Sequence, residues 1–219
     1  MENITNELNE LNKKLLSMAS HAETAVNRAI EALMTRNSEL ARQVKNDDSI
    51  IDQLEMEVDE QSITLLIKAP LAGDLRFVTA SMKICQNLER VGDEAAKIAK
   101  SANRLSSAPP LQLDLELPQM ATLALDMLKT SINAFVSRDS IVARALIPRD
   151  KEVDALNKRI NKSLTEFMMQ NPEAIPRALS LMIAIRSLER IADHAKNISE
   201  EVVFLCDAED IRHSGTRTI

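Results

Sequence analysis

Glycine and aromatic residues are scarce in this chain of 219 residues, which has three glycines, four phenylalanines and no tryptophan or tyrosine. The residues that dominate instead are Leu, Ala, Ile, Met, Glu, Lys and Arg, most of which are good helix formers. With 45% apolar residues, the chain can bury one large core or two small ones. The composition therefore predicts an all-α globular protein.

An excess of basic residues is also missing, because 27 Lys and Arg stand against 33 Asp and Glu, for a net charge of −6. The few phenylalanines are scattered, so neither the electrostatic footprint nor the stacking platform of a nucleic-acid binder is present. Two cysteines, Cys85 and Cys206, are too few and too far apart for a disulfide framework. We expect no nucleic-acid partner and a reducing compartment.

Long hydrophobic runs are absent too, since no apolar stretch approaches the roughly 20 residues that a transmembrane helix needs. The segment Met1 to Glu10 is polar and acidic and lacks the basic and apolar regions of a signal peptide. We expect a cytoplasmic protein without membrane insertion.

Two long helices are indicated by apolar residues that recur at alternating steps of three and four. One pattern runs from Leu8 to Ala29 and the other from Ile84 to Leu105, after a loop marked by Gly73 and Asp74. These patterns are typical of helices that pack along one face against neighbours.

The segment between these helices contains a polar interruption near residues 35–38. Asn37 or Ser38 is placed to cap a short helix that ends near Asn46. Asp47 and Asp48 then open a further helix, which ends near residues 69–70 because a proline follows there.

The second half of the chain repeats the first. Eight identities keep a register of 102 positions, and a register of 100 positions matches the last helix of each half. We therefore predict a tandem duplication of two antiparallel three-helix bundles, which lie side by side or end to end. Pro109 and Pro110 mark the linker, and Pro118 suits the first turn of the next helix. The predicted segments are a first repeat over 1–107, a linker over 108–117, a second repeat over 118–207 and a polar tail over 208–219.

Pairs of acidic residues four positions apart recur in both halves. At about 100° per residue, the two carboxylates of each pair lie about 40° apart on one helix face, where they repel each other. Oxygen ligands of this kind suit hard cations, and two helices meeting edge to edge would supply four of them. Asn197 and Glu200 extend the second half's face. The candidate metal ligands are Asp48, Asp52, Glu89, Asp93, Asp150, Asp154, Glu189, Asp193, Asn197 and Glu200.

The alternative interpretation is a solvated acidic face. Arg90 and Arg190 lie beside the pairs, and the helix dipole favours a negative charge at the start of a helix. Lys97 and Lys100 also replace Asn197 and Glu200 in the first half. On this interpretation the carboxylates serve solubility or bind basic surfaces of partners.

No catalytic constellation stands out. The sequence lacks a Glu-x-x-His motif, a His-Glu-x-x-His motif and a phosphate-binding glycine loop. His21 is predicted to pack within the first bundle, His194 follows Asp193 without a second histidine at ligand spacing, and His213 lies in the tail. We therefore predict that the protein is not an enzyme.

Four motifs resemble the PhoU family: PLAGDLR at 70–76, LERVGD at 88–93, LERIAD at 188–193 and DIRHSG at 210–215. The resemblance covers essentially the whole chain and implies two similar three-helix bundles, frequently dimeric. It also implies metal binding by the acidic motifs, with Mg, Mn, Zn or Fe as the ion. Because Lys97 replaces the family's asparagine and Ala192 replaces its glycine, the two halves are not equally equipped, and Asn197 and Glu200 favour the second.

The resemblance also implies a role in phosphate signalling. Such proteins couple a phosphate ABC transporter ATPase to a sensor histidine kinase and repress phosphate-starvation genes when phosphate is plentiful. Bound cations would decide whether the acidic faces are open to partners or neutralised. Two alternatives stay open: a metal-free helical scaffold, and a metal-dependent hydrolase that uses the same carboxylates.

Overall fold

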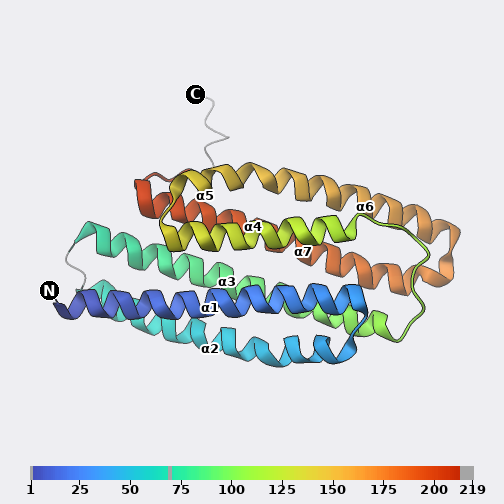
Figure 1. Cartoon of the computed structure of the whole chain (residues 1–219), viewed down its shortest axis with the longest axis horizontal. Helices are drawn as coiled ribbons and strands as arrows, with labels where there is room; N and C mark the ends of the chain where they lie inside the picture. Colours follow the sequence, from blue (N-terminus) through green and yellow to red (C-terminus); the bar gives the residue numbers. More distant parts are fainter. Residues whose placement is uncertain (1, 69–70, 213–219) are drawn as a thin grey trace.

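The computed structural model describes residues 2–68 and 71–212, and over these residues the protein consists of helices and connecting loops. The helices form two bundles that lie side by side, with their axes roughly parallel to the long axis of the molecule (Figure 1). The elements are α1 (Glu2–Thr35), α2 (Ser38–Lys68), α3 (Ala72–Ser106), α4 (Leu117–Ser137), α5 (Ser140–Leu146), a 3-10 turn (Ile147–Arg149), α6 (Asp150–Gln170), a second 3-10 turn (Pro172–Ala174) and α7 (Ile175–Asp207).

The first bundle contains α1, α2 and α3, and the second contains α4 to α7, with α5 and α6 together in the place of α2. Their apolar stripes meet in a core that includes Leu15 and Met18 from α1 and Leu88 from α3, all fully buried or nearly so. Three amphipathic helices can close around one such core, whereas two cannot.

The most extensive contact between the two bundles is that of α3 with α7, at the centre of the molecule (Figure 1). The bundles therefore lie side by side rather than end to end, which the sequence left open. They also run in opposite directions, so that α2 ends and α3 begins at one end of the molecule, while α6 ends and α7 begins at the other.

One prediction is wrong. The sequence predicted two helices here, but α2 continues through Asn46, Asp47 and Asp48 without a break. The second repeat does break at the matched place, where α5 ends at Leu146 and α6 begins at Asp150. The reason is Pro148, which matches Asn46 at a register of 102 and lacks the backbone N–H that a helix interior requires.

The predicted helix cap is confirmed, and the residue that caps the start of α2 is Asn37. Its side-chain oxygen accepts hydrogen bonds from the backbone N–H groups of Glu39 and Leu40 at 3.0 and 3.1 Å. Asp139, at the matched position, caps α5 in the same way. The preceding residues, Arg36 and Arg138, both have a positive φ, so the two repeats share this turn in detail.

The linker follows the surface but is anchored to it. Leu111, Leu113 and Leu115 pack against the core, and the guanidinium of Arg36 donates to the carbonyl oxygens of Leu105 and Ala108. Pro118 lies in the first turn of α4. Within residues 2–68 and 71–212, no helix is long and apolar enough to cross a membrane.

Candidate functional site

The first repeat gathers the predicted carboxylates of Asp48 and Asp52 on α2 and of Glu89 and Asp93 on α3. Burial raises the pKa of Asp48, and the charges of Asp52 and Asp93 raise it further. Burial likewise raises the pKa of Glu89, followed by the charges of Asp93 and Glu55. Like charges from two helices thus face one another, and a cation placed among them would relieve their repulsion.

Two acidic residues of this cluster were not predicted, Glu55 and Asp59 of α2. Burial raises the pKa of Glu55, and the nearby charges of Asp59 and Asp52 raise it further. These two residues could have been predicted from the spacing of three and four residues that continues along α2. A comparison of the two repeats does not reveal them, because the matched positions of the second repeat hold Asn157 and Asn161.

Gly92 sets how closely α2 approaches α3 at this cluster. A Cβ at this position would lie 2.8 Å from Cδ1 of Ile51 and 3.3 Å from Oδ1 of Asp48. The absence of a side chain therefore leaves room for both Ile51 and the carboxylate of Asp48 against the surface of α3.

The second repeat gathers the matching carboxylates of Asp150, Asp154, Glu189 and Asp193, but with a lysine among them. Burial, followed by the charge of Asp150, raises the pKa of Asp193 to about 6, while Lys196 acts to lower it. The Lys196 ammonium lies 2.8 Å from Oδ2 of Asp150 and 4.0 Å from Oδ1 of Asp193. The other oxygen of Asp150, Oδ1, is buried without a hydrogen-bond partner.

The donor chemistry of the first cluster fits a hard divalent cation, because its oxygens are carboxylates that already raise one another's pKa values. In the part of the chain that the structure describes, however, no three His, Cys, Asp or Glu side chains are placed to hold a single ion. Binding would therefore require rotation of exposed carboxylates such as Asp52 and Asp93.

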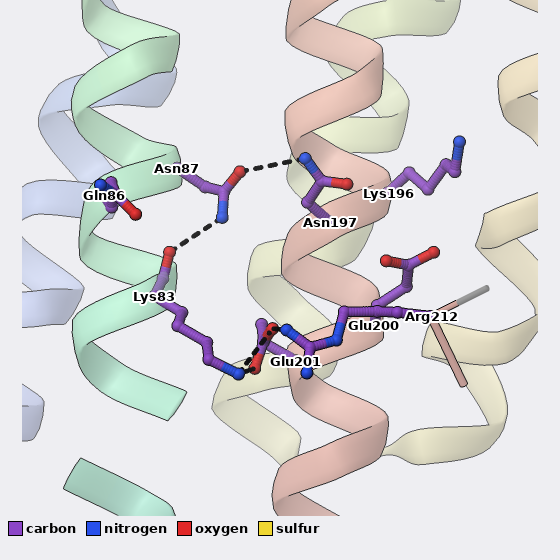
Figure 2. A pocket seen from close by; sticks show the side chains of 8 residues that line it. All are labelled: Lys83, Gln86, Asn87, Lys196, Asn197, Glu200, Glu201 and Arg212. Atoms are coloured by element: carbon purple, nitrogen blue, oxygen red, sulfur yellow. Dashed lines mark hydrogen bonds and ion pairs between the residues drawn. The ribbon is translucent and has the colours of Figure 1, made fainter. Parts of the chain in front are cut away.

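Asn197, which was predicted to extend the second metal site, faces α3, whereas Glu200 lies near Lys196, and its charge helps to raise the pKa of that lysine. Both Asn197 and Glu200 line a polar groove between α3 and α7 with a volume of about 630 Å³. The Asn197 amide donates to Oδ1 of Asn87 on α3 at 3.3 Å (Figure 2). The groove is lined by Lys83, Gln86, Asn87, Lys196, Asn197, Glu200, Glu201 and Arg212.

One of the residues that line this groove is Glu201, a buried carboxylate that sequence reasoning missed. It accepts hydrogen bonds from Lys83 of α3 at 3.1 Å and from Arg212 of the tail at 3.2 Å (Figure 2). Arg212 thus ties the described part of the tail to the joint between the repeats, which gives this arginine of the DIRHSG motif a structural role.

A second buried carboxylate, Glu94 of α3, lies further along the same joint. Its Oε1 accepts from Lys97 at 2.9 Å and from Arg190 of α7 at 3.0 Å. Burial acts to raise the pKa of Glu94, but hydrogen bonds from Ser187, Lys97 and Arg190 outweigh it and lower the pKa overall. Charged pairs therefore join the repeats at Glu94 and Glu201.

The histidines show one wrong prediction. His21 is exposed on α1 rather than packed within the bundle. His194 lies at the joint, where its Nδ1 is 3.0 Å from Oδ1 of Asn87, and burial lowers its pKa. His213 lies outside the described residues.

Comparison with known proteins agrees with the duplicated bundle. The family model of the PhoU domain matches this chain twice, over residues 15–102 and 117–202. The chain belongs to the PhoU family. Each match covers one bundle, so the duplication seen in the sequence corresponds to two PhoU domains.

Relatives align over nearly the whole chain. A phosphate-specific transport system accessory protein PhoU homolog of Pseudomonas putida is 38% identical over 96% of this chain and 83% of its own length. The homolog of Aquifex aeolicus is 35% identical over 94% of both chains. The crystal structure of PhoU from Pseudomonas aeruginosa superposes with a TM-score of 0.91 at 36% identity, covering 94% of this chain and 99% of that one. The phosphate transport system regulatory protein PhoU of Streptococcus pneumoniae superposes with a TM-score of 0.87 at 32% identity, covering 95% and 99%.

Proposed function

We propose that this protein is a cytoplasmic, non-enzymatic regulator of phosphate uptake that couples a phosphate ABC transporter to a sensor histidine kinase and represses the starvation response when phosphate is plentiful. The observation that carries the proposal is the match of both halves to the PhoU domain, together with relatives named as accessory proteins of phosphate-specific transport. The regulator acts by contact, through surfaces presented on helices.

The ends of the two bundles supply surfaces for such contacts. Where α2 gives way to α3, Ile67 is 85% exposed and Leu71 is 63% exposed. At the end of α6, Met169 is 79% exposed, and Leu179 of α7 is also exposed. These large apolar side chains lie at opposite ends of the molecule, because the repeats run in opposite directions (Figure 1). Two such ends suit a protein that bridges two partners.

The bridging role is tested by capturing the tagged full-length chain from phosphate-replete cells and identifying its partners by mass spectrometry. We expect enrichment of the transporter ATPase and the sensor kinase. Ile67→Asp should lose one partner and Met169→Asp the other, because each places a charge on one apolar end. Met56→Asp is the matched control, since Met56 is 59% exposed in the middle part of α2. Capture of neither partner by the unmodified chain would exclude the coupling role.

The carboxylates of the first repeat extend the proposal, because they provide a site for Mg, Mn, Zn or Fe. Asp48, Asp52, Glu89 and Asp93 are the residues that would hold the ion, and the ion would neutralise this face of the bundle. Titration with Mn²⁺ in a calorimeter tests the site. Asp48→Asn with Asp93→Asn should weaken binding at least tenfold, because carboxylates are stronger ligands than amides. Asp114→Asn, an exposed change in the linker, is the control.

The titration also separates the regulator from its metal-free alternative. If Mn²⁺ binds no more tightly than about 1 mM while the partners are still captured, the protein is a metal-free scaffold.

A further inference from the structure

We propose that Lys196 is a tethered cation that occupies the carboxylate cluster of the second repeat and keeps divalent cations out of it. This inference rests on the proposed cation binding of the first repeat. It reverses the sequence-based expectation, in which Asn197 and Glu200 made the second repeat the better metal site.

The placement of Lys196 is the first argument. Its ammonium lies among the acidic residues, 2.8 Å from Oδ2 of Asp150 and 4.0 Å from Oδ1 of Asp193. Figure 2 shows its side chain leaving α7 on the side away from Asn87 and α3. Asp150 is 8% exposed, so its charge needs a partner, and Lys196 is the partner that it has.

The matched position in the first repeat holds a residue that cannot do this. A register of 100 aligns Lys196 with Ala96, just as it aligns Asp193 with Asp93. The neighbouring Lys97 directs its ammonium toward the joint, where it lies 2.9 Å from Oε1 of Glu94 and 3.9 Å from Oδ2 of Asp93. Lys97 therefore reaches the edge of the first cluster at Asp93, but among the described residues no ammonium contacts Asp48 as Lys196 contacts Asp150 in the second.

The number of acidic residues also makes the first cluster the more attractive one for a cation. The first cluster has six carboxylates, because Glu55 and Asp59 extend the row on α2, whereas Asn157 and Asn161 stand at the matched positions of α6. The two asparagines are hydrogen-bonded to each other, the Nδ2 of Asn161 donating to Oδ1 of Asn157 at 2.5 Å. The second repeat thus has fewer negative charges and an internal positive one, and each change weakens the attraction for an external cation.

The two repeats therefore differ in what neutralises their carboxylate clusters. Neutralisation of the first cluster depends on the concentration of an ion, whereas neutralisation of the second is built into the chain. Only the first face of the molecule then responds to metal, and a partner that contacts the second face experiences a constant charge.

The test exchanges the residues at the matched positions of the full-length chain. Mn²⁺ bound per chain is measured by calorimetry and by the electron paramagnetic resonance signal of free Mn²⁺. Lys196→Met removes the ammonium and keeps an apolar stem, and it should about double the Mn²⁺ bound at saturation. Ala96→Lys adds an ammonium to the first cluster and should weaken its Mn²⁺ binding at least tenfold. Lys158→Met changes an exposed lysine of α6 and should change neither quantity.

The outcomes separate this inference from the proposed cation site. If the unmodified chain binds Mn²⁺ and Lys196→Met binds the same amount, Lys196 does not exclude metal, although the first site stands. If only Lys196→Met binds Mn²⁺, the exclusion holds and the first site is wrong. If neither chain binds it, both ideas are overturned.

The two variants also guard against misfolding. Lys196→Met leaves Asp150 buried without its partner, so its melting temperature should fall in EDTA and recover on addition of Mn²⁺. Ala96 is half-buried and lies outside the fully buried core. Ala96→Lys with Mn²⁺ binding equal to that of the unmodified chain would contradict the inference independently of the first variant.

Discussion

The contact of Gly92 with Ile51 gives a prediction that can be worked out from the structure. A methyl group at position 92 would lie 2.8 Å from Cδ1 of Ile51, well inside van der Waals contact. Ile51 is 1% exposed, so its side chain has little room to move away. The second repeat shows another solution at the matched positions, where Val153 lacks the δ-methyl of isoleucine and Ala192 supplies the methyl that glycine lacks.

The expected changes in the free energy of unfolding combine backbone entropy with the cost of overpacking or of a cavity. Gly92→Ala gains about 0.5–1 kcal/mol from the lower backbone entropy of alanine in the unfolded chain, but overpacking costs about 1–3 kcal/mol. We expect a net loss of roughly 0.5–2 kcal/mol. Ile51→Val alone should cost about 0.5–1.5 kcal/mol, because it leaves a small cavity. The double variant should lie within about 0.5 kcal/mol of the unmodified protein, since the new methyl fills the space of the lost one.

The assay is urea unfolding of the four proteins of this double-mutant cycle in EDTA, followed by circular dichroism. Gly73→Ala is the control, because a Cβ at Gly73 would have no atom within 4 Å, and its stability should not fall. Additive losses in the double variant would refute the argument, since they would show that the two positions do not compete for the same space.

The break between α5 and α6 predicts that Asn46→Pro will destabilise the protein by about 3 kcal/mol in urea unfolding, because α2 is continuous at this position, while Asn46→Ala should be almost neutral. A similar stability of both variants would show that α2 tolerates the break. The cluster of the second repeat predicts a dependence on pH. The pKa of Asp193 rises from 3.8 to about 6 on folding, so the folded state holds its proton more tightly and this residue's contribution to stability falls as the pH rises through that window. Asp193→Asn should flatten the decline in melting temperature between these pH values in EDTA, and parallel profiles would contradict the assignment.

Sequence periodicity predicted the long helices well, because the apolar residues of α1 and α3 follow one face over many turns. It predicted the break in α2 wrongly. The residues near Asn46 resemble a helix start, but Val44 and Ile51 are both buried and hold one continuous helix in register across them. The break in the second repeat depends on Pro148, which the first repeat does not share.

The residues of the candidate site could be predicted only in part, because spacing along one helix does not give the contacts between helices. Spacing along one helix places carboxylates on a common face, so the predicted acidic pairs could be found without a structure. Spacing does not say which face of α7 meets α6 and which meets α3. Lys196 and Asn197 are neighbours in the chain, yet one joins the acidic cluster and the other faces the joint with α3. The buried carboxylates Glu94 and Glu201 were missed because their partners come from distant segments.

The proposed repressive role can be measured directly in cells that lack this protein, through expression of a phosphate-starvation reporter at high phosphate. We predict that the reporter is active without the protein and is switched off when the unmodified chain is restored. Variants that charge the apolar ends, Ile67→Asp and Met169→Asp, should fail to switch it off, whereas Met56→Asp should succeed. A reporter that stays silent at high phosphate in cells without the protein would contradict the proposed function.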